Sequence, residues 1–352
     1  MGVVACSRPG QGGAERRRRA GDTNSVRQLC AGSAVGRLAP SLNDRPGSPS
    51  SSTNVRLGIL LGAGAVVFWS FGAPLVYLGA KAAGTWPFVA VASLTGGGLQ
   101  LLFRRIYHGE LRSALWLPWR LWVLPIVCFV CYGLVWPWAL VSSNPKQVFG
   151  VSLINYLWPV LTVLFSVCLV PGVRLTTRTV VALCLALAGL LCANLSNLRE
   201  LSSAGGEGAS VARQLLPYGL ALLAATTWGL YSAFLVRWRA WARNYITSPL
   251  GFIVIGLLAG GVVAVTRPVP ATWTPFGAAM TVLYGVGPLA AGYLLWELAL
   301  PRARVQTLSL VAAATPILST ALLCGFLRTP PGPELAVAAL LVSGGVLLSV
   351  TE

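Results

Sequence analysis

The chain has 352 residues, of which 55% are hydrophobic and 10% are charged, and its mean hydropathy is +0.72. This composition excludes an ordinary soluble globular protein and indicates a membrane protein. The net charge of +17 would suggest a nucleic-acid partner if it formed a patch on a folded domain. Its arginines lie instead in the N-terminal tail and in short connections, so we expect a lipid bilayer as the partner, and no nucleic acid.

Acidic and histidine residues are too few for most hydrolytic or metal chemistry. The chain has nine Asp and Glu residues and one histidine, His108, whereas such chemistry needs paired carboxylates or clustered ligands. The sequence also lacks a Walker-type phosphate loop. We therefore expect no metal site, no cofactor and no enzymatic activity.

Residues 1–54 form a basic N-terminal tail that is rich in Gly, Ser, Pro and Arg and lacks apolar periodicity. Such a segment cannot bury enough apolar surface to fold, so we predict that it is disordered. It contains no apolar core of the length found in secretory signals near its start. The alternatives are that this segment is a transit peptide, or that the start codon has been assigned incorrectly and the segment is not part of the protein.

Ten apolar spans follow the tail, and each has about the length that a helix needs to cross a bilayer, roughly 17–25 residues. The sequence therefore predicts an all-α polytopic membrane protein with ten transmembrane helices. The predicted spans are residues 57–80, 86–103, 121–141, 147–170, 179–197, 214–236, 248–266, 276–300, 305–327 and 334–350.

Orientation is predicted from the positions of arginine and lysine, which favour the cytoplasmic side. With the N-terminus inside, eleven of these residues fall in inner connections and six in outer ones. We therefore expect both termini to be cytoplasmic, in a plasma or inner membrane. The inner set is Arg104, Arg105, Arg112, Arg120, Arg174, Arg178, Arg237, Arg239, Arg243, Arg302 and Arg304, and the outer set is Lys81, Lys146, Arg199, Arg213, Arg267 and Arg328.

The fourth span carries a polar stripe. Ser152, Asn155, Pro159, Thr162 and Ser166 recur at spacings of three and four, so they share one helical face. In hydrocarbon such a stripe is tolerated only against protein or a water-filled cavity. The alternatives are a substrate cavity, which we favour for the whole stripe, and a kinked helix with inter-helix hydrogen bonds.

The two halves of the chain echo each other at an offset of roughly 160 residues. Trp69 corresponds to Trp228, Tyr132-x-x-x-Trp136 to Gly292-x-x-x-Trp296, and Trp158-Pro159 to Thr315-Pro316. Five spans in each half would invert the second half relative to the first. We therefore predict two inverted five-helix repeats, at residues 55–197 and 214–352, separated by a loop at residues 198–213.

At these residues the chain resembles the EamA-type proteins of the drug/metabolite transporter superfamily, and within them the YddG-type aromatic amino acid exporters. The most specific element is Asn155-Tyr-Leu-Trp-Pro-x-Leu-Thr-x-Leu-Phe165. The resemblance covers residues 57 to 350 and implies ten helices around a central cavity, with export of amino acids and related metabolites. The chain departs from relatives at Gly133 and Phe149, near which they carry acidic residues.

A candidate substrate cavity follows from the repeat, because inverted repeats bind substrate near the midplane beside interrupted helices. Its aromatic members suit an aromatic or hydrophobic amino acid, and Asn155 can both donate and accept hydrogen bonds. The alternative for each residue is ordinary packing. The candidate residues are Trp69, Tyr132, Asn155, Tyr156, Trp158, Pro159, Trp228, Tyr231, Tyr293, Trp296 and Pro316.

Glu297 is the only acidic residue well inside an apolar run, which makes it the candidate for coupling transport to protons. Arg302 and Arg304 lie five and seven residues further on. We therefore favour an ion pair at the helix end over a proton carrier.

The sequence thus predicts a secondary transporter, an exporter or facilitator, of aromatic or hydrophobic amino acids and related small metabolites that works by alternating access. The outward direction is what the resemblance implies. The first alternative is a drug, metabolite or nucleotide-sugar carrier of the same superfamily. A membrane-embedded protein that does not transport is the second.

Overall fold

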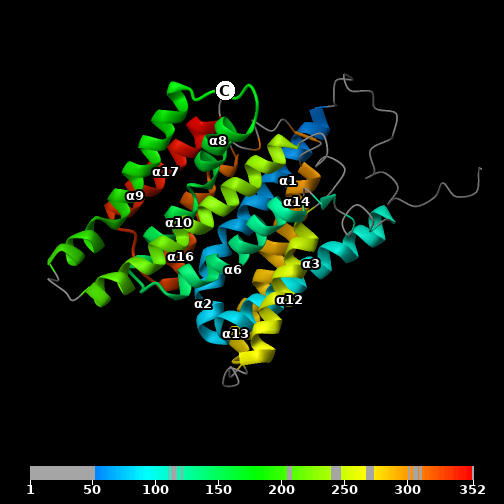
Figure 1. The fold of residues 1–352 in the computed structure, drawn as a ribbon, viewed down its shortest axis with the longest axis horizontal. Coiled ribbons are helices and arrows are strands. Elements are labelled where there is room, and N and C mark those ends of the chain that lie inside the picture. Colours follow the sequence, from blue (N-terminus) through cyan, green and yellow to red (C-terminus); the bar gives the residue numbers. More distant parts are fainter. Residues whose placement is uncertain are drawn as a thin grey trace, which may run out of the picture. The chain divides into compact units, whose positions relative to one another are not determined.

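The computed structural model describes residues 52–109, 111, 116, 118–119, 122–203, 208–238, 247–266, 273–299, 302–303, 308 and 311–350. The tail predicted to be disordered lies outside these residues, apart from its last three, which begin the first helix. Every regular element in the described ranges is helical (Figure 1). This agrees with the prediction of an all-α membrane protein, since a helix bonds its own backbone groups where water is absent.

Helices of the predicted first half follow the apolar runs. Several runs are divided into two consecutive pieces. The elements are α1 (Ser52–Ser70), α2 (Gly72–Ala83), α3 (Thr85–His108), η2 (Trp122–Ile126), α6 (Val127–Val141), α7 (Gln147–Asn155), α8 (Trp158–Leu169) and α9 (Thr177–Ser203).

The predicted second half has the same character. One of its spans passes through three consecutive elements, α13, η3 and α14. The elements are α10 (Gly208–Arg237), α12 (Ser248–Thr266), α13 (Pro275–Tyr284), η3 (Gly285–Gly292), α14 (Tyr293–Ala299), α16 (Thr315–Leu327) and α17 (Pro333–Val350).

Eight helical stretches are long and apolar enough to cross a membrane, and two apolar helices are shorter, Thr315–Leu327 and Pro333–Leu348. The chain is therefore a multi-pass membrane protein. Each of the eight stretches overlaps one of the first eight predicted spans, and the two shorter helices overlap the ninth and tenth.

One predicted connection is wrong in its extent. Residues 198–213 were expected to form a loop, but α9 continues to Ser203 and α10 already begins at Gly208. Leu198, Arg199, Glu200 and Leu201 are good helix formers, so the helix continues beyond its apolar run. Apolarity marks the part of a helix that lies in lipid, and it does not mark the end of the helix.

Prolines interrupt the fourth and ninth spans at matching places. Between α7 and α8, the backbone N–H groups of Tyr156 and Leu157 donate to carbonyls three residues back, and Pro159 occupies the first turn of α8. Pro316 occupies the first turn of α16 in the same way. Proline is tolerated there because the first N–H groups of a helix have no intrahelical acceptor.

Two further spans contain a wide, π-helical turn with an internal proline, Pro125 in η2 and Pro288 in η3. Such turns leave a backbone carbonyl to be satisfied by another group. In η3 the carbonyl of Leu289 accepts a hydrogen bond of 2.7 Å from the side chain of Gln100 on α3.

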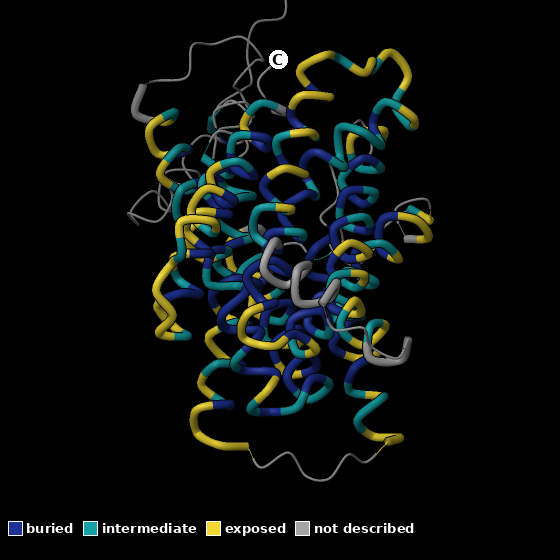
Figure 2. Tube along the Cα trace, turned by 90° about the vertical axis from the view of Figure 1, so that its left-hand side faces the viewer, coloured by how far each residue is buried: buried dark blue, intermediate teal, exposed yellow. Residues whose placement is uncertain are grey.

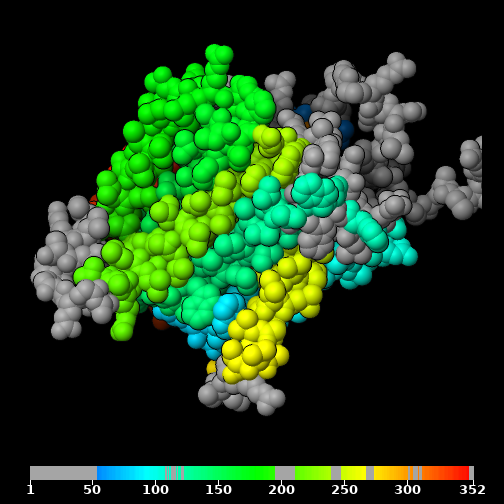
Figure 3. Space-filling view, in the orientation of Figure 1, coloured from blue at the N-terminus to red at the C-terminus, as the bar shows by residue number. Residues whose placement is uncertain are grey.

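Neighbouring helices are paired across the two predicted halves. α3 packs along α12, α9 along α17, and α2 against α13; α9 and α17 lie side by side in Figure 1. α10 packs against both α6 and α8, and α1 packs against η3, α14 and α16. Figure 3 shows α10 crossing one face of the molecule alongside α6.

Burial follows from these pairings. The main core contains Phe88, Phe129, Trp136 and Phe252 together with many alanines, which allow the helices to approach closely. Exposed residues lie on the outward surfaces of the helices (Figure 2), and they include many leucines and valines, such as Leu257 and Val265. Apolar side chains on that outer surface suit contact with lipid.

Candidate functional site

Aromatic side chains from six helices meet in the interior of the described chain. The helices are α1, α6, α8, α10, α12 and α14. We call this group the central aromatic cluster. It consists of Trp69, Phe129, Tyr132, Trp158, Trp228, Tyr231, Phe252, Tyr293 and Trp296.

Trp228 on α10 occupies the centre of this cluster. Its ring centroid lies 4.6 Å from that of Tyr132 and 6.2 Å from that of Trp158. The rings of Tyr231 and Tyr293 lie 5.3 Å and 6.1 Å away. Aromatic pairs at such distances contribute about 0.5–1.5 kcal/mol each beyond the burial of their area. Trp228 therefore connects helices from both predicted halves.

Phe129 and Phe252 extend the cluster, and sequence reasoning missed both of them. The Phe129 ring lies 5.0 Å from Phe252 and 5.2 Å from Tyr231. Phe129 precedes the predicted Tyr132 by three residues, which places it on the same helical face. That spacing could have identified Phe129. No comparable signal in the sequence points to Phe252.

Trp69 occupies the α1 side of the cluster. Its ring lies 5.5 Å from Tyr293 and 5.2 Å from Trp296. A Cβ atom at Gly292 would lie 2.8 Å from Nε1 and Cδ1 of Trp69, so glycine is required for this close approach. Both ends of the repeat motif Gly292-x-x-x-Trp296 therefore pack against Trp69.

Most of the predicted cavity residues come together in this cluster, and of the other four only Asn155 adjoins it directly. The Asn155 side chain is within hydrogen-bonding reach of the Tyr132 hydroxyl. Tyr156 packs instead with Leu153 and Ala338 in a separate group, and its hydroxyl lies near Ser319 on α16. The two matched prolines, Pro159 and Pro316, are buried at the starts of α8 and α16.

Two polar atoms in or beside the cluster are buried without a hydrogen-bond partner in the part of the chain that the structure describes. They are the indole Nε1 of Trp69 and Oδ1 of Asn155. A buried group without a partner costs about 1–3 kcal/mol. Ser152 and Thr162 of the polar stripe, by contrast, donate to carbonyls of their own helices. The two unpartnered atoms comprise one donor and one acceptor.

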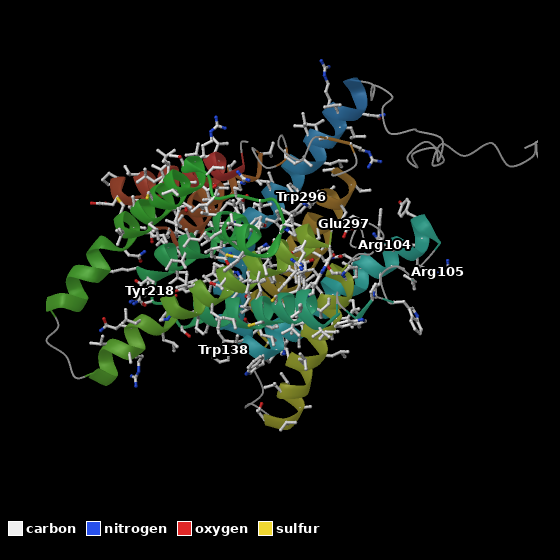
Figure 4. The ribbon with its side chains drawn as sticks, turned by 45° about the horizontal axis from the view of Figure 1, so that its top comes forward. Arg104, Arg105, Trp138, Tyr218, Trp296 and Glu297 are labelled. Atoms are coloured by element: carbon white, nitrogen blue, oxygen red, sulfur yellow. The ribbon has the colours of Figure 1, made fainter. Side chains whose placement is uncertain are left out.

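Glu297 forms an ion pair, with a partner that sequence reasoning did not identify. Nη2 of Arg104 on α3 lies 3.4 Å from its Oε2 atom, and the Arg104 and Glu297 side chains are 13% and 25% exposed. Figure 4 shows these two residues together, with Trp296 beside Glu297. Arg302 donates to the carbonyl of Leu298, and Arg304 lies outside the described residues. The ion pair therefore joins two helices that the sequence did not connect.

Comparison with known proteins identifies the family. The profile of the EamA-like transporter family matches residues 56–195. The chain is also 30% identical over 294 residues to a protein of Ancylobacter novellus named aromatic amino acid exporter YddG, covering 82% of this chain and 96% of that relative. The chain belongs to the EamA-like transporter family. It is thus a YddG-like member of the drug/metabolite transporter superfamily.

Two further comparisons of this EamA-like transporter support the same family and fold. A protein of Salmonella typhimurium with the same name is 27% identical over 291 residues, covering 82% of this chain and 95% of the relative. A crystal structure matches with a TM-score of 0.60 at 24% identity, over 83% of this chain and 96% of that one, which supports the fold. Because family and relatives are transporters, the comparisons favour transport over catalysis.

Proposed function

We propose that this transporter exports aromatic or hydrophobic amino acids across the cell membrane by alternating access, and that the central aromatic cluster binds the substrate. The observation that carries this proposal is the set of unpartnered polar atoms among aromatic rings. An apolar site with a few polar groups is the usual construction of a small-molecule site. The two relatives described above are named as exporters of aromatic amino acids, which supports the same substrate class.

Each part of such a substrate has a matching group. The rings of Trp158 and Trp228 offer faces and edges to an aromatic side chain. The indole N–H of Trp69 is a donor suited to a carboxylate, and Oδ1 of Asn155 is an acceptor suited to an ammonium group. A strongly charged solute such as a nucleotide would lack neutralising partners among these residues, and the cost of burying it would be large.

Alternating access is supported by the pairing of helices. In a repeat of five spans, α10 corresponds to α1, α6 to η3 and α14, and α8 to α16. The contacts of α10 with α6 and α8 therefore correspond to the contacts of α1 with η3, α14 and α16. The matched prolines Pro159 and Pro316 add a second correspondence. We therefore propose ten crossings in two inverted repeats, with α16 and α17 forming the last two.

Transport by the purified protein in proteoliposomes tests the substrate. We expect uptake of radiolabelled Phe, Tyr or Trp, and we expect Trp158→Ala and Asn155→Ala each to reduce it by about tenfold, as for the loss of a contact of about 1.4 kcal/mol. Trp116→Ala is the control, because Trp116 is 76% exposed. If the wild type moves none of the three, or if neither cluster variant differs from the control, the substrate assignment is wrong.

Orientation has its own test. The charge bias favours a cytoplasmic location for both termini. Reporter fusions at residues 110, 175 and 240 should therefore report a cytoplasmic location, and fusions at residues 143, 205 and 330 an external one. A reporter that places residue 352 outside would contradict the inverted repeat.

A further inference from the structure

The Glu297–Arg104 ion pair belongs to a larger hydrogen-bonded network. Oγ of Ser248 on α12 lies 3.2 Å from Oε1 of Glu297 and 2.9 Å from Oε1 of Gln100. Gln100 on α3 donates in turn to the carbonyl of Leu289 in η3. We call Gln100, Arg104, Ser248 and Glu297 the Glu297 network. It connects α3 of the first predicted half to α12, η3 and α14 of the second.

This network lies directly beside the central aromatic cluster. Glu297 follows Tyr293 by four residues, one helical turn on the same face. The hydroxyl of Tyr231 hydrogen-bonds to Oγ1 of Thr247, which immediately precedes Ser248. Two members of the cluster therefore adjoin the network, and both lie at the side where α3 and α14 end and α12 begins.

Stability alone does not account for such a network in a membrane protein. A partly buried ion pair gives little net stabilisation, because removing two charges from water offsets their attraction. Polar contacts between membrane helices are also weak, and so they can be exchanged. Ionisable residues within membrane spans mark functional elements by default. These properties suit a contact that has to form and break.

We propose that the Glu297 network is a latch that closes the transporter on one side of the central aromatic cluster and opens in each transport cycle. In the present conformation the latch is closed, with α3, α12 and α14 held together. Opening separates α3 from α12 and α14 and gives the cluster access to that side of the membrane. The cycle itself rests on the proposed transport function, whereas the closed latch and its stability do not.

Hydrogen exchange of the full chain in lipid nanodiscs, measured without substrate, tests the latch. We expect Arg104→Gln and Glu297→Gln to raise amide exchange at the start of α12 and the end of α3 by about threefold to twentyfold, the range for single polar contacts between membrane helices. Arg105→Gln is the matched control, since Arg105 is the next residue on α3 and is exposed. The α9–α17 pair, which packs apart from the network, is the internal reference and should not change.

Two further variants distinguish loss of the latch from misfolding. Ser248→Ala removes a single hydroxyl and should raise exchange in the same segments, by less than the charge variants. The charge swap Arg104→Glu with Glu297→Arg keeps an ion pair and should return exchange toward the wild-type value. The swap should also retain transport in proteoliposomes, whereas a Glu297 required as proton carrier would leave it inactive.

The latch proposal is overturned if the amide exchange of Arg104→Gln and Ser248→Ala equals that of Arg105→Gln, or if exchange rises equally in α9 and α17. It is also overturned if the charge swap restores neither the exchange rate nor transport. Failure of the substrate proposal is a separate result. If the wild type moves no aromatic amino acid and the exchange pattern holds, the substrate assignment fails and the latch stands.

Discussion

The two ends of α3 are held by different kinds of contact. At one end Gln100 and Arg104 join the Glu297 network. At the other, Trp86 packs edge-on against Trp138 of α6 with ring centroids 5.5 Å apart, and from Trp86 to Arg104 the helix rises about 27 Å. One end thus depends on charge and directed hydrogen bonds, and the other on aromatic packing.

A cation near the Trp86 end in the sequence, Lys81, shows the same difference. Lys81 on α2 donates to the Tyr77 hydroxyl at 2.9 Å and to the carbonyl of Ser143 at 3.1 Å, and it is exposed. Arg104 is mostly buried against a carboxylate. Truncating the partner of an exposed charge costs little, because water replaces the contact, whereas truncating the partner of a buried charge leaves that charge buried and unpaired. The ends should therefore respond differently to the same substitution.

The largest effect is expected from removing these cations. Arg104→Leu should lower the free energy of unfolding by about 3 kcal/mol, because Glu297 is left without its ion-pair partner. Lys81→Leu should lower it by less than about 1 kcal/mol, since an exposed contact contributes little. Denaturant unfolding in detergent measures both. Equal effects would show that the ends are not distinct.

An intermediate effect is expected along the α3–α12 packing that connects the ends. A Cβ atom at Gly256 would lie 2.6 Å from Cγ of Leu94, whereas at Gly260 no atom lies within 4 Å. Gly256→Ala should therefore lower the free energy of unfolding by about 1–3 kcal/mol through overpacking. Gly260→Ala should be neutral or raise it by about 0.5 kcal/mol, as for a helical glycine with space around it. Denaturant unfolding in detergent measures both variants, and a large loss of unfolding free energy for Gly260→Ala would contradict this packing.

The smallest difference in stability between two variants is expected where an indole is replaced by a phenyl ring. Nε1 of Trp69 in the cluster and Nε1 of Trp138 at the α3 end are both buried without a partner in the described ranges. Trp69→Phe and Trp138→Phe should lower the unfolding free energy by similar amounts, since each loses only the packing of the larger ring and neither loses a hydrogen bond. Transport should distinguish them. Trp69→Phe should lower uptake of an aromatic amino acid about tenfold, the loss of one hydrogen bond to a charged group, and Trp138→Phe should leave it unchanged. Equal uptake by the two variants would remove Trp69 from the site.

Several features of the fold were predictable because they are local. Apolar runs and the scarcity of charge specify helices in lipid, since each helix satisfies its own backbone. Prolines such as Pro159 and Pro316 specify where helices start, because the restriction acts on the neighbouring turn. The extent of α9 and α10 was misjudged, because helix propensity continued where apolarity stopped.

The sequence by itself determined the helices, the membrane class, the family resemblance and the aromatic residues Trp69, Trp228 and Tyr293, because each is encoded by residue type and by spacing along the chain. Only the tertiary structure decided which partners meet. Arg104 and Glu297 are 193 residues apart, and no local pattern relates them. Phe252 joins the cluster, and Tyr156 packs in a separate group, for the same reason. Contacts between helices depend on how whole faces pack together, and that information lies in the combined surfaces of several spans rather than in the spacing within one.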